Sequence, residues 1–103
     1  MSDYKADVAK YTHPVNDAAI AAIVRYCGIA LRNADSALVS GTDPHELAAV
    51  RKGFATKKLG LATDAADSGL AAVLSKMAGV QRKSRVTFYY LLAEATGTLD
   101  KLR

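Results

Sequence analysis

The residues whose types and spacing best suit a chemical role in this chain are basic and lie between positions 76 and 85. Ser84 stands where its side chain can cap a helix that begins directly after it. The first backbone N–H groups of a helix have no partner inside the helix, and with the helix dipole they favour an anion. We therefore predict an anion-binding site in this segment, formed by Arg82, Lys83, Ser84, Arg85 and Lys76.

A phosphate, a nucleic-acid backbone or an acidic protein segment could supply the anion at this site. The alternative is a basic loop that only stays in solvent, because most surface charges have no partner. Arg85 needs a partner of some kind, since a positive charge at a helix N-terminus opposes the dipole by about 0.3–1 kcal/mol. An acid in the first half of the chain, such as Asp35 or Asp43, would also serve.

A second basic group lies along another predicted helix and consists of Arg51, Lys52, Lys57 and Lys58. After residue 50 the chain holds ten basic and four acidic residues, whereas up to that point it holds four basic and six acidic ones. Such polarity can steer an anionic partner. If both basic groups face the same way, they form one extended positive surface; the alternative is a solvated basic face.

Catalytic and metal-binding motifs are not recognisable in the sequence. Acid–base catalysis needs a His or paired carboxylates in a cleft, and a metal site needs three or more ligands at suitable spacing. His13 precedes a proline, and His45 lies in the first turn of a capped helix. Cys27 is the single cysteine, and on an apolar helix stripe we expect it to be a buried, inert thiol. We expect no enzyme, no metal and no cofactor.

Helices must position these residues, because every segment that can be assigned has helical periodicity. The clearest start is at Asp43, where Pro44 suits the first helical position and Glu46 can reach back to the Asp43 amide. Residues 29–42 are ambiguous between turns and one short helix, and no run alternates as a strand does. Caps and apolar stripes predict five helices, over residues 2–13, 16–28, 43–60, 63–77 and 84–96.

The fifth predicted helix is apolar around almost its whole circumference, and only Thr87 and Glu94 share a polar stripe. Such a helix belongs in the centre, and the 20 alanines of the chain let other helices approach closely. Gly69 inside the fourth helix costs about 1 kcal/mol relative to Ala, which indicates a close helix crossing or a local bend. We predict an all-α fold, a compact bundle of about five helices with the C-terminal helix (84–96) central.

Two nucleic-acid interpretations of the last two helices are disfavoured. Their short connection is like that of a helix-turn-helix, but a recognition helix must present base-reading side chains on an exposed face. Here that face holds Thr87 and Glu94, and phosphate repels the latter. Tyr89 and Tyr90 could stack on single-stranded bases, yet aromatic residues in an apolar helix are expected in the core.

Length and composition set the class of protein. With 103 residues, 50% of them apolar, the chain is expected to form a single domain over residues 1–103. The longest wholly apolar run, residues 18–24, is much shorter than the about 20 residues of a membrane-spanning helix. Asp3 and Asp7 lie where a signal peptide has a basic flank. We expect a cytoplasmic protein without membrane association.

Six stretches of the sequence together carry a resemblance to a known family: residues 2–4, 28–32, 36–40, 43–44, 57–61 and, most specifically, 83–94 (KSRVTFYYLLAE). They resemble small bacterial proteins grouped as domain-of-unknown-function family 2853. The resemblance implies a small, single-domain, cytoplasmic bacterial protein, and it carries no activity and no site residue.

We therefore expect a small non-enzymatic binding or adaptor protein that docks an acidic protein segment or a nucleic-acid backbone on residues 76–85. The alternative is a structural or self-associating helical bundle with no nucleic-acid role. Salt-dependent retention on an anionic matrix would favour the first function. A concentration-dependent dimer without such retention would favour the second.

Overall fold

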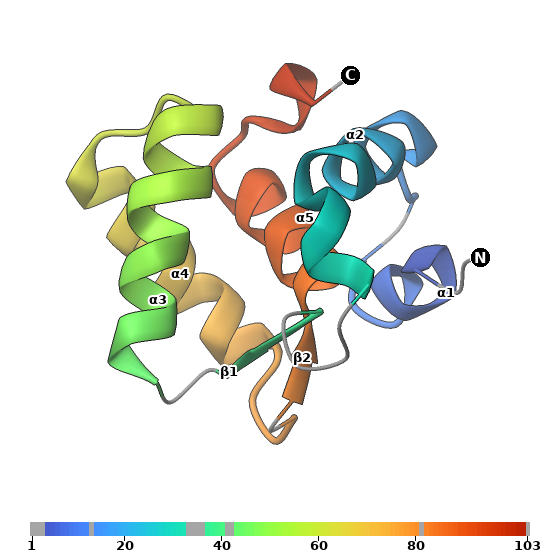
Figure 1. Ribbon diagram of the computed structural model, residues 1–103, viewed down its shortest axis with the longest axis horizontal. Coiled ribbons are helices and arrows are strands. Elements are labelled where there is room, and N and C mark those ends of the chain that lie inside the picture. Colours follow the sequence, from blue (N-terminus) through green and yellow to red (C-terminus); the bar gives the residue numbers. More distant parts are fainter. Residues whose placement is uncertain (1–3, 13, 33–36, 41–42, 81, 103) are drawn as a thin grey trace.

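In the described part of the chain, five α-helices and one pair of short strands make up the fold (Figure 1). The computed structural model describes residues 4–12, 14–32, 37–40, 43–80 and 82–102. None of the helices described in these ranges is long and apolar enough to cross a membrane. In chain order the elements are α1 (Tyr4–Ala9), α2 (Asp17–Cys27), the 3-10 turn η1 (Gly28–Arg32), β1 (Leu38–Ser40), α3 (Pro44–Val50), the π-helix η2 (Arg51–Lys58), α4 (Thr63–Lys76), β2 (Arg82–Ser84), α5 (Arg85–Ala95) and the 3-10 turn η3 (Leu99–Lys101).

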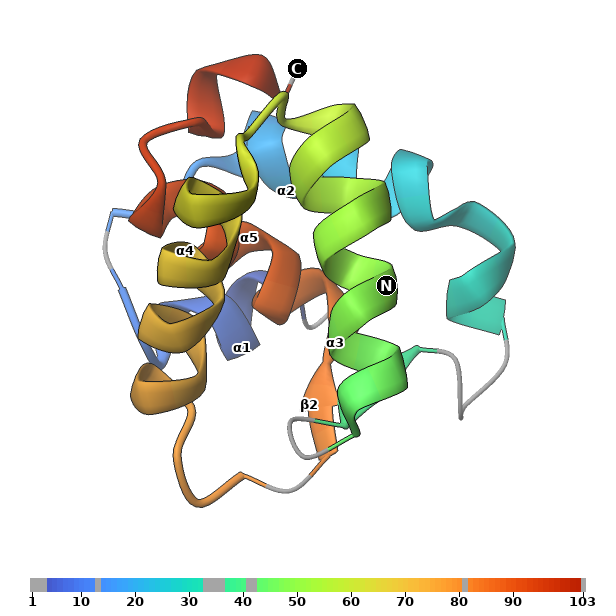
Figure 2. The same ribbon diagram turned by 90° about the vertical axis from the view of Figure 1, so that its left-hand side faces the viewer.

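The helix α5 is the centre of the bundle, as its apolar circumference predicts. It lies with α3, η2 and α4 on one side and α1 and α2 on the other (Figures 1 and 2). Every side chain from Val86 to Ala93 is buried. The largest fully buried side chains around and within it are Tyr90, Phe54, Phe88, Ile23, Leu59, Met77, Leu91, Leu92 and Leu102. The prediction of an all-α bundle of five helices with a central C-terminal helix is confirmed.

The polar stripe predicted on α5 is not exposed, which corrects the sequence analysis. Thr87 is fully buried, and its hydroxyl donates a hydrogen bond to the carboxylate of Asp7 in α1. Glu94 is half-buried and accepts a 2.6 Å hydrogen bond from the Thr12 hydroxyl. The α1 segment therefore covers this side of α5 and supplies polar partners for it, as a buried polar group requires.

Three predicted helix starts are confirmed by their caps. The Asn16 side chain accepts a hydrogen bond from the Ala19 N–H at 3.0 Å, and Asp43 accepts one from the His45 N–H at 2.9 Å. Ser84 accepts a longer bond, at 3.5 Å, from the Thr87 N–H. These side chains satisfy N–H groups that the first helical turn leaves without a partner.

The third predicted helix is a single rod with two geometries. Its α-helical part ends at Val50, and residues 51–58 continue as a π-helix. Gly60 stops it in the left-handed conformation, with φ of 71°, and the Leu61 N–H then donates to the Ala55 carbonyl at 3.0 Å. The predicted glycine stop is confirmed, because only glycine adopts this conformation without steric cost.

A two-stranded antiparallel sheet corrects the expectation that no strand forms. Its register pairs Leu38 with Ser84, Val39 with Lys83 and Ser40 with Arg82. β1 falls in the ambiguous stretch 29–42, of which residues 33–36 and 41–42 lie outside the described ranges. Strands of three residues are too short to show alternation, so the sheet is specified by contacts between distant parts of the chain.

Gly69 marks a close crossing of α4 and α5. A Cβ atom at this position would lie 2.6 Å from the Thr96 Cγ2 atom and 2.8 Å from the Leu92 Cδ1 atom. Both distances are shorter than carbon atoms tolerate, so the two helices approach as closely as they do because residue 69 has no side chain. The predicted close crossing is therefore present.

Candidate anion-binding site

The segment predicted to bind an anion enters α5 as a β-strand, and the helix N-terminus is already engaged. The Arg85 N–H donates to the Ala37 carbonyl at 2.8 Å, and the Thr87 N–H donates to Ser84. Two N–H groups of the first helical turn, which were predicted to bind a ligand, thus bond to the chain itself.

Lys83 is buried within this segment, with 6% of its surface exposed. Its ammonium group donates a hydrogen bond to the carbonyl of Val80, and its backbone pairs with Val39 in β1. Lys83 is therefore a poor contact for an anion from solvent, because binding the anion would break this hydrogen bond.

Arg85 is the most heavily used side chain of the predicted site. Its Nη2 lies 2.5 Å from the Glu46 Oε1 and donates to the Leu38 carbonyl at 3.4 Å, while its Nη1 donates to the Tyr89 hydroxyl at 2.9 Å. Burial disfavours its charge, but Tyr89 and Glu46 outweigh burial and raise the pKa of Arg85. The side chain is only 14% exposed.

Arg85 forms its ion pair at the helix N-terminus with Glu46, in place of the two acids named from the sequence. Asp43 caps α3, and Asp35 lies outside the described residues. Glu46 was expected to close a capping box with the Asp43 amide, yet its carboxylate accepts from Arg85 instead. A charge-assisted contact of this kind is stronger than a bond to a neutral amide.

Two predicted contacts remain, Lys76 and Arg82. Lys76 lies 3.6 Å from the Glu94 carboxylate. The side chain of Arg82 lies outside the described residues. Four of the five predicted residues therefore have partners within the chain, which gives them a structural role; anion binding at 76–85 stays a prediction.

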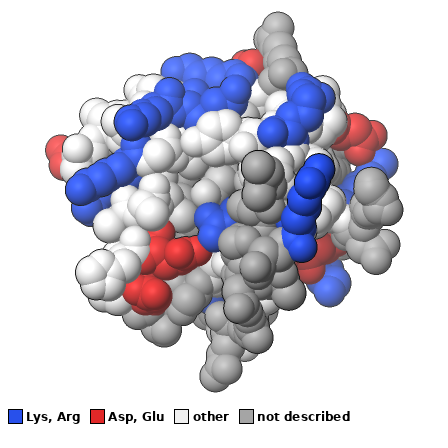
Figure 3. Space-filling model, viewed as in Figure 1, with Lys and Arg blue, Asp and Glu red and all other residues white. Residues whose placement is uncertain are grey.

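The second basic group follows η2 and differs in its partners. Arg51 forms a 3.1 Å ion pair with Asp67 in α4. Lys52, Lys57 and Lys58 are exposed, and none of them pairs with an acid of the described residues. Figure 3 shows Lys and Arg side chains across the upper part of the view, over the end of η2, while Asp and Glu lie at the edges of the view and in its lower part. We call Lys57 and Lys58 the η2 lysine pair.

The two predicted basic groups do not form one extended surface. In both ribbon views β2 lies at the opposite end of the molecule from the last turn of η2 (Figures 1 and 2). Near that last turn the Lys101 ammonium donates to the Leu59 carbonyl at 2.8 Å. Lys101 therefore adds a third cation beside the η2 lysine pair, and sequence spacing gave no sign of it.

A cluster of three aromatic rings lies between the core and the surface beside Lys58. Phe54 and Tyr89 stack with ring centroids 4.1 Å apart and an interplanar angle of 20°. Tyr26 lies on them at 5.4 Å from Phe54 and 6.4 Å from Tyr89. Tyr26 is the exposed member of this cluster, with 43% of its surface in solvent. The Lys58 ammonium lies 5.8 Å from its ring centroid.

Cys27 lies half-buried at the end of α2. Burial raises the pKa of its thiol to about 11, and Arg85 lowers it by a smaller amount. The thiol is therefore protonated at neutral pH, as expected for an inert cysteine. Among the residues that the structure describes, no three His, Cys, Asp or Glu side chains gather as metal ligands do.

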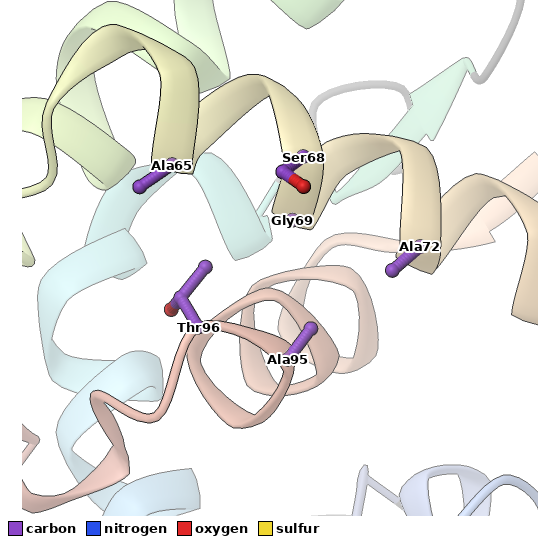
Figure 4. A pocket seen from close by; sticks show the side chains of 6 residues that line it. All are labelled: Ala65, Ser68, Gly69, Ala72, Ala95 and Thr96. Carbon is purple, nitrogen blue, oxygen red and sulfur yellow. The ribbon is translucent and has the colours of Figure 1, made fainter.

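An open groove lies between α4 and α5 (Figure 4). Its volume is about 310 Å³. The Thr96 hydroxyl in its wall already donates to the Leu92 carbonyl at 2.9 Å. No titratable side chain lines the groove, because its six lining residues are Ala65, Ser68, Gly69, Ala72, Ala95 and Thr96.

The comparison with family models gives a match over nearly the whole chain. The sequence model of a family described as "Protein of unknown function (DUF2853)" matches residues 3–100. No curated protein matches the chain.

Proposed function

Because the chain belongs to the DUF2853 family of proteins of unknown function, which brings no activity with it, we propose from the geometry that it is a non-enzymatic binding protein for an anionic partner. The partner docks on the η2 lysine pair, with Lys101 beside it. This keeps the binding function predicted from the sequence and moves its centre from residues 76–85 to the far end of the bundle.

The observation that carries the proposal is the uneven use of basic side chains. Among the described residues, five of them form ion pairs with acids: Lys5, Lys10, Arg51, Lys76 and Arg85. Lys57 and Lys58 stand together without an acid of the described residues. An anion that approaches them therefore displaces no existing ion pair, and adjacent like charges raise the local potential that attracts it.

The helical geometry also supports this location. Long π-helical segments are rare, and π-helical turns occur frequently at functional sites. The two lysines have a second role as well, because cations in the last turn of a helix offset its dipole by about 0.3–1 kcal/mol each at most. That role does not require both side chains to be exposed, and their exposure leaves the two ammonium groups accessible to a partner.

Retention on immobilised heparin in a salt gradient tests the proposal. The Lys57→Ala/Lys58→Ala variant should elute at clearly lower salt than the wild-type protein. The matched control is Lys5→Ala/Lys10→Ala, which removes the same charge from exposed positions in and next to α1. Circular dichroism should show both variants folded, since none of the four side chains is buried.

Three outcomes would contradict the proposal. The first is a wild-type protein that heparin does not retain, and the second is an equal shift in both double variants, which net charge alone would cause. The third is a larger shift on neutralising Arg82 than on neutralising the η2 lysine pair. That result would return the docking site to residues 76–85.

A self-associating bundle is the second candidate function, and the α4–α5 groove favours it. Its small side chains would let a helix of another copy approach closely, as Gly69 does within the fold. Sedimentation velocity over a hundredfold range of protein concentration tests it. A concentration-dependent dimer that Ala72→Glu abolishes would support self-association, and a monomer throughout would contradict it.

A further inference from the structure

Tyr26 stands out among the large apolar side chains of the described residues because its ring is exposed. Within those ranges only Tyr26 and Val80 have so much of their surface in solvent, 43% and 36%. An aromatic ring beside paired lysines is the combination with which single-stranded nucleic acids are bound: bases stack on the ring, and cations hold the backbone.

The Tyr26 ring is fixed in place before any ligand arrives. It packs at 57° to Phe54, which is 1% exposed and itself stacks on Tyr89. Phe54 and Tyr89 therefore support the ring from the core side, and the exposed Lys58 side chain, whose ammonium lies over the ring, must move aside for a base to stack there. A ring that is already immobile loses little conformational entropy on binding, so the stacking energy is not spent on ordering it.

The surrounding charge suits a phosphate backbone. Lys58 places its ammonium 5.8 Å from the Tyr26 ring centroid, and Lys57 precedes it in the last turn of η2. A nucleotide stacked on the ring would bring its own phosphates near the lysines, whereas the charged groups of a sulfated sugar or of an acidic peptide come without an aromatic base to stack on the ring. Duplex DNA and RNA keep their bases stacked inside the helix, so they could use the lysines but not the ring.

We propose that Tyr26 is a base-stacking platform and that the η2 lysine pair contacts the phosphates of single-stranded nucleic acid. This inference rests on the proposed function, because it names the partner of the same surface. Stacking on one ring accepts any base, so binding has little sequence preference.

Fluorescence anisotropy with a labelled 20-nucleotide thymidine strand tests the inference, with a duplex of equal length and heparin as competitors. Tyr26→Ala should weaken binding to the single strand about tenfold and leave heparin retention unchanged. Tyr26→Phe keeps the ring and should bind like the wild-type protein. Lys57→Ala/Lys58→Ala should reduce the slope of log affinity against log salt by about 1.4, from about 0.7 per phosphate contact on a single strand.

A tryptophan at the same position supplies a direct reading of stacking and a safeguard if Tyr26→Ala fails to fold. The chain has no Trp, so Tyr26→Trp supplies a single tryptophan, whose emission can be excited apart from that of the remaining tyrosines. The thymidine strand should quench its emission, and heparin should not.

Different results overturn different claims. Unchanged single-strand affinity in Tyr26→Ala, absence of quenching in Tyr26→Trp, or equal competition by the duplex overturns the stacking inference and leaves the proposed function standing. If heparin does not retain the wild-type protein, both the stacking inference and the proposed function are overturned.

Discussion

Arg85 joins three segments of the chain through one guanidinium group. It reaches Glu46 in α3, the Leu38 carbonyl in β1 and the Tyr89 hydroxyl one turn further along α5. Hydrogen bonds to charged groups contribute about 1.5–3 kcal/mol each, which exceeds the about 0.3–1 kcal/mol that a cation costs at a helix N-terminus. The planar fork of donors makes this possible, and a lysine ammonium could not serve all three directions.

Removal of this side chain should destabilise the fold. We expect Arg85→Ala to lower the free energy of unfolding by about 1.5–3 kcal/mol, because Glu46 loses its charge-assisted partner. Urea unfolding followed by circular dichroism measures the loss. Arg25→Ala is the control, since Arg25 is exposed, and it should change stability by less than about 0.5 kcal/mol. A loss at Arg85 no larger than that of the control would contradict the structural role.

The thiol of Cys27 should react slowly in the folded protein. Burial raises its pKa from the ordinary value of 9.0 to about 11, so at pH 8 its thiolate fraction is about a hundredfold below the ordinary one. Because the thiolate is the nucleophile, iodoacetamide should alkylate the native protein far more slowly than the urea-unfolded protein. Mass spectrometry over time measures both rates, and equal rates would contradict burial of the thiol.

The same shift makes stability fall in alkali. The thiol loses its proton near pH 9 in the unfolded protein and near pH 11 in the folded one. The stabilisation of the folded state that Cys27 contributes below pH 9 is therefore lost as the pH rises from 9 to 11. In Cys27→Ser this part of the pH dependence should disappear.

Helix packing rather than helix propensity decides the effect of Gly→Ala changes in this fold. At Gly69 a Cβ atom would meet the Thr96 and Leu92 side chains, whereas at Gly53 in η2 nothing lies within 4 Å. Gly69→Ala should therefore lose about 1–3 kcal/mol through overpacking, and Gly53→Ala should gain up to about 1 kcal/mol. Thermal unfolding measures both, and stabilisation by Gly69→Ala would show that the crossing relaxes at little cost.

Elements with local signals could be predicted, and elements that depend on distant residues could not. Asn16, Asp43 and Ser84 cap the N–H groups of the residues that follow them, so a short stretch of sequence contains the whole interaction. The strand pair has no such signal, because Leu38 and Arg85 are 47 residues apart in the chain yet bonded in space. The burial of Thr87 likewise depends on Asp7, 80 residues away.

At the scale of the whole molecule, folding pairs some basic side chains with acids and leaves others exposed. The sequence has a formal net charge of +4 and could identify Lys57 and Lys58 as a basic pair. It could not show that folding pairs Lys76 and Arg85 of the 76–85 group with acids, nor that α2 brings Tyr26 to the η2 lysine pair. Half of the candidate site was therefore predictable, since its aromatic half comes from another helix.

The order of synthesis gives the central position of α5 a further consequence. It is the last of the five α-helices to leave the ribosome, yet the others pack on it. Isolated helices of 6 to 14 residues, the lengths found from α1 to α4, are marginal in water. The nascent chain therefore acquires its core only when residues 85–95 emerge, and until then its apolar stripes remain open to chaperones and proteases.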